Sequence, residues 1–130
     1  MEIERQVLKR IFLKNRHLQT CLVINIGTGI TCLELMIQMF KIKAKESTLY
    51  LIDQFQKDSW DNYGLRLLEQ SGISIPIKLL AGPSNQSLAK LEKKMLKTFD
   101  LIYLGGRYNY ENINTDFFYV HNLLLSLIHI

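Results

Sequence analysis

Two features of the sequence could together hold a nucleotide. Gly27-Thr28-Gly29 follows an apolar run at residues 21–26 and precedes apolar residues at helical spacing. Glycine permits the tight turn and positive φ of such a junction, and it leaves room for a ligand. Asp53 ends the next apolar run, 24 residues after Gly29. In nucleotide-binding α/β folds an acid about 20 residues on accepts hydrogen bonds from ribose hydroxyls. The pair predicts a nucleotide site, with a plain structural turn and a strand-ending carboxylate as the alternatives.

Helical and strand patterns alternate around these features. Apolar residues at a spacing of three or four predict a helix, and short runs rich in β-branched residues predict a buried strand. Helices are expected over residues 3–13, 30–40, 58–71, 85–95 and 111–125, and strands over residues 21–26, 48–53, 75–80 and 99–104. This alternation predicts an α/β fold with a parallel sheet wound on both faces by helices.

The composition limits the classes of function. With 130 residues, 48% of them hydrophobic and 22% charged, the chain suits one globular domain. Its formal net charge of +4 is mild, and the basic clusters at residues 5–16, 41–45 and 90–97 are expected on solvated helix faces. Aromatic residues are not interleaved with these lysines and arginines, so nucleic-acid binding is not favoured.

The cysteines and the N-terminus indicate a reducing compartment. Cys21 and Cys32 lie in no Cys-x-x-Cys or Cys/His cluster, so buried free thiols are expected. The N-terminus is charged and lacks the apolar block of a signal peptide. No apolar run approaches the roughly 20 residues that a membrane helix needs. We therefore expect a cytoplasmic protein without a membrane partner.

The fourth predicted strand carries a resemblance to a known family. Residues 99–117, FDLIYLGGRYNYENINTDF, resemble the segment "FDLIFIDGDHSYEGVKADL" of class I S-adenosylmethionine-dependent methyltransferases, in the small-molecule O-methyltransferase-like branch. Upstream, residues 23–29 resemble motif I ("vEIGTG"), residues 49–53 the second strand with its ribose-binding acid, and residues 79–88 the segment "lirGdsxexL". The resemblance covers nearly the whole chain.

The resemblance implies a fold, a cofactor and a set of site residues. The fold would be a Rossmann-like, doubly wound parallel sheet of about four strands in the order 3-2-1-4, lacking the last three strands of the family. The cofactor would be S-adenosyl-L-methionine, and the methyl acceptor a small molecule. The implied cofactor-binding residues are Asn25, Gly27, Thr28 and Gly29 at the methionine portion, Asp53 at the ribose, Ser84 near the adenine, and Gly105 beside the sulfonium.

Several departures from the family pattern leave the activity open. Asn25 stands where motif I has a carboxylate, and Pro83 replaces the acid after the third strand. Gly105 and Arg107 replace acids of the "DGDH" block, of which the first is a magnesium or calcium ligand in metal-dependent members, so we expect no metal. A degenerate, non-catalytic cofactor-binding module therefore remains an alternative.

The catalytic base and a second cofactor class are also open. Asp116 and His121 are candidate bases by residue type alone, and both are expected on a surface helix. A fragment of a nicotinamide-dependent oxidoreductase is another alternative. Its full Gly-x-Gly-x-x-Gly fingerprint would require glycine where this chain has Cys32.

The end of the chain differs from the rest. Residues 125–130, LSLIHI, resemble the translation of a transposon-end adapter used in sequencing libraries, and a native amphiphilic tail is the alternative. We expect residues 1–124 to be the cofactor-binding part of a methyltransferase domain and residues 125–130 to be a possible non-native tail. The fourth strand would then be an unguarded apolar sheet edge, and association detectable by light scattering is expected.

Overall fold

Five helices alternate with four strands along the described part of the chain. The computed structural model describes residues 2–14, 19–42, 47–80, 82–95, 97–105 and 110–124. The elements are α1 (Glu2–Lys14), β1 (Thr20–Ile24), α2 (Ile30–Ile42), β2 (Thr48–Ile52), α3 (Tyr63–Gln70), β3 (Ile77–Leu80), α4 (Ser84–Lys94), β4 (Leu101–Leu104) and α5 (Tyr110–Leu123). The predicted alternation is confirmed.

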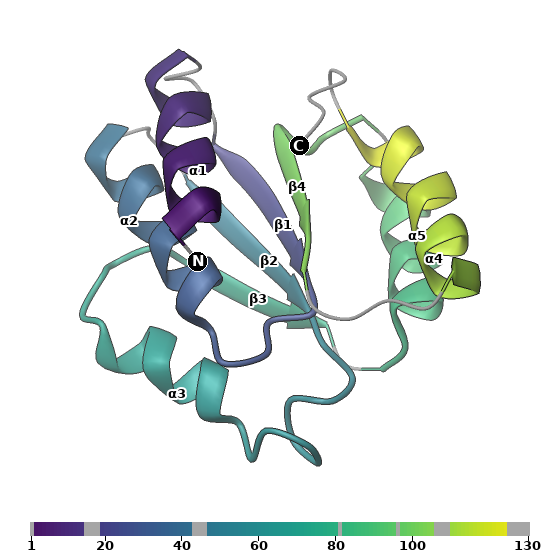
Figure 1. The fold of residues 1–130 in the computed structure, drawn as a ribbon. Helices are drawn as coiled ribbons and strands as arrows, with labels where there is room; N and C mark the ends of the chain where they lie inside the picture. Colours follow the sequence, from purple (N-terminus) through teal and green to yellow (C-terminus); the bar gives the residue numbers. More distant parts are fainter. Residues whose placement is uncertain are drawn as a thin grey trace.

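The strands form one parallel sheet in the order β3-β2-β1-β4, which confirms the expected order (Figure 1). Cys21 of β1 lies opposite Leu49 of β2 on one side and Leu101 of β4 on the other. The Asp100 carboxylate fixes the entry into β4, because its Oδ2 accepts hydrogen bonds at 2.9 Å from the backbone N–H groups of Gln19 and Thr20. Parallel neighbours require crossover connections, and helices provide them here.

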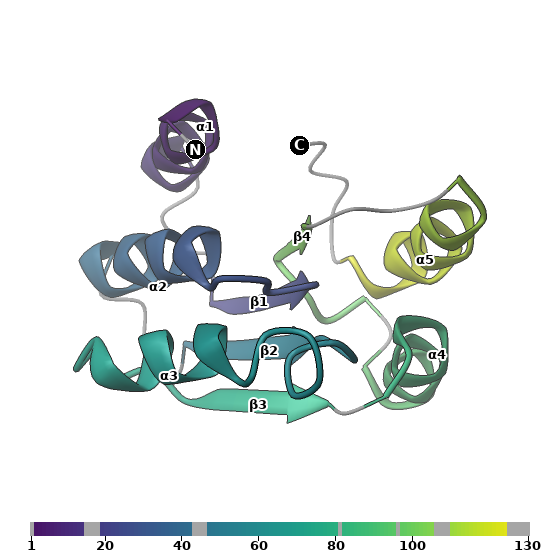
Figure 2. The same cartoon turned by 60° about the horizontal axis from the view of Figure 1, so that its bottom comes forward.

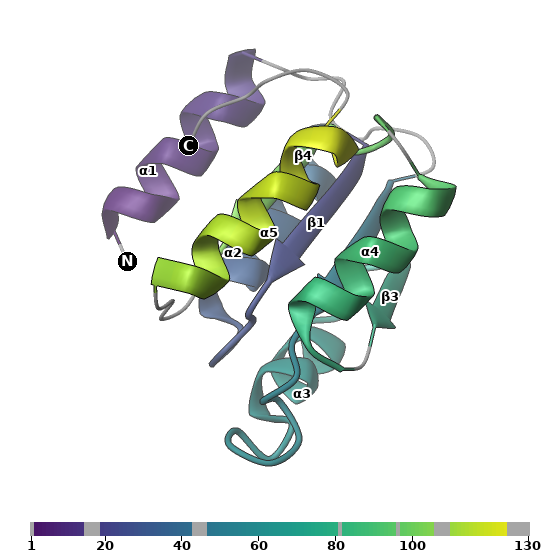
Figure 3. The ribbon, with the colours of Figure 1, turned by 90° about the vertical axis from the view of Figure 1, so that its right-hand side faces the viewer.

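Helices cover both faces of the sheet. One apolar cluster joins α1, α2 and α3 to the face of β1 that carries Cys21 and Val23. A second joins α4 and α5 to the opposite face, which carries Leu22 and Ile24. Figure 2 shows α1 lying over α2, and Figure 3 shows α4 beside α5. Because both faces of β1 are buried, its sequence is continuously apolar instead of alternating.

Helix α3 begins later than the sequence predicts. A helix starting at Asp58-Ser59 is wrong, because residues 54–62 form turns and α3 begins at Tyr63. Asp61 and Asn62 have φ values of 49° and 57°, a left-handed conformation that a continuous α-helix does not contain. The helix ends at Gln70, within one residue of the predicted end at residue 71, and Gly72 follows with a φ of 73°.

Helix α2 is confirmed, but the apolar residues at helical spacing that predict it are not all buried. Ile30 and Phe40 are 47% and 58% exposed. The buried residues of this helix are Cys32, Leu35, Met36, Gln38 and Met39. Because α2 is apolar around most of its circumference, its sequence period alone does not determine which side α1 and the sheet cover. No described helix is long and apolar enough to cross a membrane.

Both cysteines are free and buried, as predicted. Burial raises the pKa of the Cys32 thiol from its ordinary value of 9.0 to about 12. The pKa of Cys21 is raised as well, first by burial and then by the neighbouring Asp100 carboxylate. Neither thiol is expected to be a nucleophile at neutral pH, since the thiolate is the reactive form.

These thiols predict a loss of stability at high pH. Between pH 9 and 12 the unfolded chain loses thiol protons that the folded chain keeps, so the free energy of unfolding should fall as pH rises. A fully ionised thiol contributes a slope of about 1.4 kcal/mol per pH unit. Lysine and tyrosine side chains also titrate in this range, so the thiol must be distinguished from them. Urea unfolding of the parent chain and of Cys32→Ala, each at several pH values, makes that distinction. The slope should be shallower in the variant, and equal slopes would contradict the prediction.

Candidate functional site

The glycine turn at the carboxyl end of β1 is the centre of the candidate site. Asn25, Gly27 and Gly29 all have positive φ, of 67°, 58° and 86°. The Gly29 N–H donates to the Ile26 carbonyl at 3.0 Å, and the Gly29 carbonyl accepts from the N–H of Leu33 at 2.8 Å. The turn therefore ends the strand and begins α2, as the sequence predicts. Asn25 tolerates the left-handed conformation better than most residues with a side chain.

The ends of β2 and β4 lie on either side of this turn. The Asn25 N–H donates to the Ile52 carbonyl at 2.7 Å, and the Gly105 N–H donates to the Ile24 carbonyl at 2.8 Å. A Cβ atom at Gly105 would lie 2.8 Å from the Asn25 carbonyl oxygen, so only glycine fits there. The predicted residues of motif I and Gly105 therefore meet at one edge of the sheet. Thr28, within the turn, is partly exposed.

Asp53 binds the glycine turn directly. Its side chain is buried, and Oδ2 accepts hydrogen bonds from the N–H groups of Ile26 at 2.9 Å and Gly27 at 3.2 Å. Oδ2 also accepts from Gln56 Nε2 at 3.0 Å, and Oδ1 accepts from the Phe55 N–H at 2.9 Å. The carboxylate thus holds the turn in shape. A ribose hydroxyl would have to donate to the remaining acceptor position on Oδ1, and that role stays a prediction.

Gln56 and Gly64, in the segment that follows Asp53, also contact the glycine turn. Gln56 is only 2% exposed, and its Nε2 donates to the Gly27 carbonyl at 3.1 Å while its Oε1 accepts from the Leu65 N–H at 3.1 Å. A Cβ atom at Gly64 would lie 2.6 Å from the Gly27 carbonyl oxygen. The first turn of α3 therefore packs against the backbone of the glycine turn. Neither residue was predicted from the sequence to belong to the site.

Ser84 lies at the start of α4, after β3, and bonds to α5. Its hydroxyl donates to both carboxylate oxygens of Asp116, at 2.8 and 2.9 Å. Asp116 is 1% exposed, so its expected surface position is wrong, whereas His121 is exposed as predicted. A carboxylate at this place is favoured by the partial positive charge of the α4 N-terminus. The predicted contact between Ser84 and adenine remains a prediction.

We expect Ser84→Ala to reduce stability, because it removes this partly buried hydrogen bond to the carboxylate of Asp116. A hydrogen bond to a charged group is worth about 1.5–3 kcal/mol, and the free energy of unfolding should fall by that amount. Ser59→Ala, in an exposed turn, is the control and should change it by less than about 0.5 kcal/mol. Urea unfolding of both variants tests the prediction, and equal effects would count against it.

Metal ligation has no support among the described residues. Within them, no group of three or more His, Cys, Asp and Glu side chains could hold a metal ion. Gly105 supplies only backbone atoms, and Arg107 and Tyr108 lie outside the described residues, as do residues 125–130. Metal independence therefore stays a prediction, which titration of magnesium or calcium against the thermal midpoint would test.

Comparisons with known proteins find likeness in structure and none in sequence. No protein-family model matches this chain, and no curated protein matches it. The structure is similar to the O-methyltransferase from Bacillus cereus in complex with SAH, with a TM-score of 0.74 and 13% identity over 95% of this chain and 52% of that chain. The chain therefore shares the fold of the matching half of this solved structure.

A second solved structure supports the same fold. The O-methyltransferase TomG from Streptomyces achromogenes, involved in tomaymycin synthesis and solved in complex with SAM, has a TM-score of 0.72 and 16% identity. That comparison covers 93% of this chain and 50% of that chain. The present chain therefore spans about half the length of these solved structures. The expected Rossmann-like sheet is confirmed.

Proposed function

We propose that this chain is the S-adenosylmethionine-binding part of a class I methyltransferase that acts on a small molecule. The observation that carries the proposal is the glycine turn, held at the carboxyl edge of the sheet between Asp53 and Gly105. In open α/β sheets ligands bind at this edge. The proposal is supported by the likeness in fold to O-methyltransferases solved with SAH and SAM.

The residues at this edge fit the cofactor in type and place. Asn25, Gly27 and Thr28 are partly exposed, so the turn can present backbone groups to the methionine portion. Asp53 Oδ1 would accept a ribose hydroxyl, while Oδ2 holds the turn. Ser84 would lie near the adenine, and Gly105 would lie beside the sulfonium. S-adenosylmethionine supplies the methyl group, and the contribution of these residues is binding and orientation.

Residues of this site also bear on the two alternative functions, a nicotinamide-dependent oxidoreductase and a non-catalytic module. Cys32 lies in the first turn of α2 and is 1% exposed, at the position where a dinucleotide fingerprint would place glycine for close packing of helix and strand. This disfavours a nicotinamide cofactor. The Asp53 carboxylate accepts hydrogen bonds from the backbone of the glycine turn, which is a structural role. This role favours a non-catalytic module as the second candidate. Asp116 is buried and bonded by Ser84, so it is a poor candidate for a base at the glycine turn.

Calorimetric titration with SAH and with NAD tests the proposal. SAH should bind with one site per chain, and NAD should not bind. Glu69→Ala, at an exposed position of α3, is a control that should leave the affinity for SAH unchanged. Binding of NAD alone would favour the oxidoreductase reading. A transfer assay with labelled S-adenosylmethionine and a panel of small hydroxylated acceptors then separates a transferase from a non-catalytic module.

A further inference from the structure

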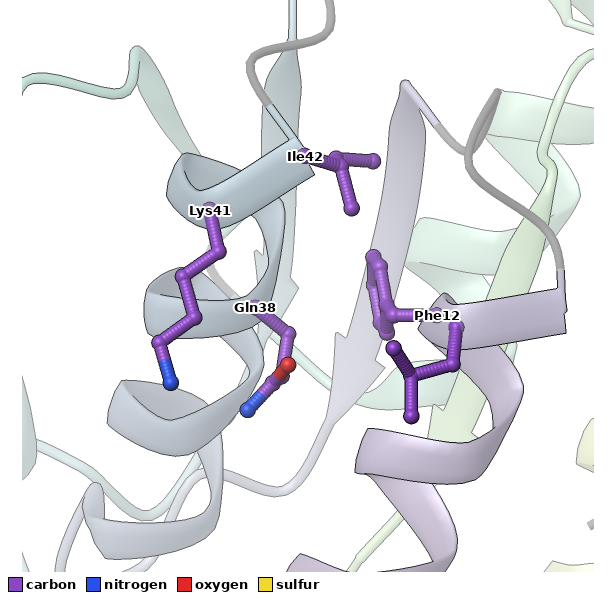
Figure 4. A pocket seen from close by; sticks show the side chains of 5 residues that line it. Phe12, Gln38, Lys41 and Ile42 are labelled. Atoms are coloured by element: carbon purple, nitrogen blue, oxygen red, sulfur yellow. The ribbon is translucent and has the colours of Figure 1, made fainter.

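A cleft of about 210 Å³ opens between the last turns of α1 and α2. Phe12 and Leu13 line it from α1, and Gln38, Lys41 and Ile42 line it from α2 (Figure 4). Because α2 starts at the carboxyl end of β1 and ends before β2 begins, its last turn lies at the amino ends of the strands. The cleft is therefore at the other end of the sheet from the glycine turn.

Gln38 places a polar group without a hydrogen-bond donor in this cleft. The residue is 5% exposed, and its Nε2 donates to Glu34 Oε1 at 3.3 Å. An ionised carboxylate only accepts hydrogen bonds, so the amide nitrogen must face Glu34 and the amide oxygen must face elsewhere. In Figure 4 the side chain extends from α2 toward α1. No described residue donates a hydrogen bond to Gln38 Oε1, and a buried acceptor in this state is unfavourable.

Lys41 adds a positive charge on the same side of α2. Residues three apart in a helix are surface neighbours, so Lys41 lies next to Gln38. No described carboxylate forms an ion pair with Lys41, and the nearby Glu34 pairs with Arg5 at 3.4 Å. The last turns of α1 and α2 carry partial negative charge, which Lys14 and Lys41 offset.

We propose that this cleft binds a small hydroxycarboxylic acid with an apolar body. The hydroxyl donates to Gln38 Oε1, the carboxylate pairs with the Lys41 ammonium, and the apolar body contacts Phe12 and Ile42. The cleft is smaller than the roughly 300–1,000 Å³ of pockets for drug-sized ligands, so the ligand is correspondingly small. This site is separate from the glycine turn and does not depend on the function proposed there.

The test uses three probe molecules that differ in one group each. 4-Hydroxybenzoate carries the donor and the charge, benzoate lacks the donor, and phenol lacks the charge. Titrations of the 130-residue chain, followed by NMR or calorimetry, should show 4-hydroxybenzoate binding about tenfold more tightly than benzoate, the size of one hydrogen bond. Equal affinities, or no saturable binding of 4-hydroxybenzoate at millimolar concentration, would overturn the proposal.

Two variants test which residue makes each of the two proposed polar contacts with the ligand. Gln38→Leu should remove the difference between 4-hydroxybenzoate and benzoate, and Lys41→Gln should weaken both acids without affecting phenol. Lys9→Gln, on the exposed side of α1, matches the change in charge outside the cleft and should have no effect. Lys41 is exposed, so its variant should fold even if Gln38→Leu does not. Unchanged binding in Lys41→Gln, or competition between 4-hydroxybenzoate and SAH, would place the ligand elsewhere and refute the proposal.

Discussion

Replacing Gly29 with alanine is expected to lower the free energy of unfolding by about 3 kcal/mol or more, and to abolish SAH binding. A Cβ atom at this position would lie 2.8 Å from the carbonyl oxygen of Gly64 and 2.9 Å from its Cα. Both are backbone atoms, so neither can rotate away as a side chain could. The φ of 86° adds the strain of a left-handed residue. The glycine turn and the first turn of α3 would have to separate.

Gly72→Ala is the matched control for this prediction. Gly72 also has a positive φ, of 73°, but a Cβ atom there would meet nothing within 4 Å. Gly72→Ala should lower the free energy of unfolding only by the backbone strain, about 1–2 kcal/mol, and should leave the affinity for SAH unchanged. Urea unfolding and calorimetric titration of both variants separate strain from collision. If the two variants lose the same stability, the close approach of Gly29 and Gly64 does not determine the effect of Gly29→Ala.

Asp53→Ala is expected to be as damaging, with a loss of roughly 2–6 kcal/mol in the free energy of unfolding, since each of two N–H groups left without an acceptor costs about 1–3 kcal/mol. The substitution leaves the buried N–H groups of Ile26 and Gly27 without an acceptor, and it also removes the partner of Gln56 Nε2. The glycine turn should lose its shape and SAH affinity should fall. Asp58→Ala removes an exposed carboxylate from the same connection and should have little effect.

Asp53→Asn separates holding the turn from binding the ribose. The remaining oxygen can still accept from Ile26 and Gly27, so stability should be closer to the parent than in Asp53→Ala. If Oδ1 also accepts a ribose hydroxyl, affinity for SAH should fall about ten- to hundredfold. An SAH analogue without the 2′ and 3′ hydroxyls should then bind parent and variant alike. A similar loss of affinity for both ligands would assign Asp53 a purely structural role.

Much of the fold could be predicted from the sequence because the strands are short apolar runs with turn residues between them. The parallel arrangement followed from the alternation of strands with helices, and the order from the resemblance to a family. The start of α3 could not be predicted, because Asp58-Ser59 has the composition of a helix cap. What decides the outcome is the left-handed backbone at Asp61 and Asn62, where the chain turns back toward Gly27.

The candidate site was predictable only in part, for the same kind of reason. Gly27, Gly29 and Asp53 stand at the ends of apolar runs, and their types alone suggest a ligand-binding edge. Gln56 contacts Gly27 across 29 residues of sequence. Asp116 is likewise tied to α4 from a helix 32 residues away. Hydrophobic periodicity does not indicate such contacts, because they join residues that become neighbours only in the folded chain.

The pairing of β4 with β1 bears on the order in which the strands form during folding. Ile26 and Asp53 are joined across 27 residues, whereas Thr20 and Asp100 are joined across 80. Closing the longer loop costs roughly 1 kcal/mol more in chain entropy, since each doubling of a loop adds about 0.6 kcal/mol. Contacts between distant residues form slowly for this reason. We therefore expect β1 and β2 with the glycine turn to form first, and β4 to dock later. During synthesis the inner strand β1 keeps one side unpaired until the chain has grown past Leu104.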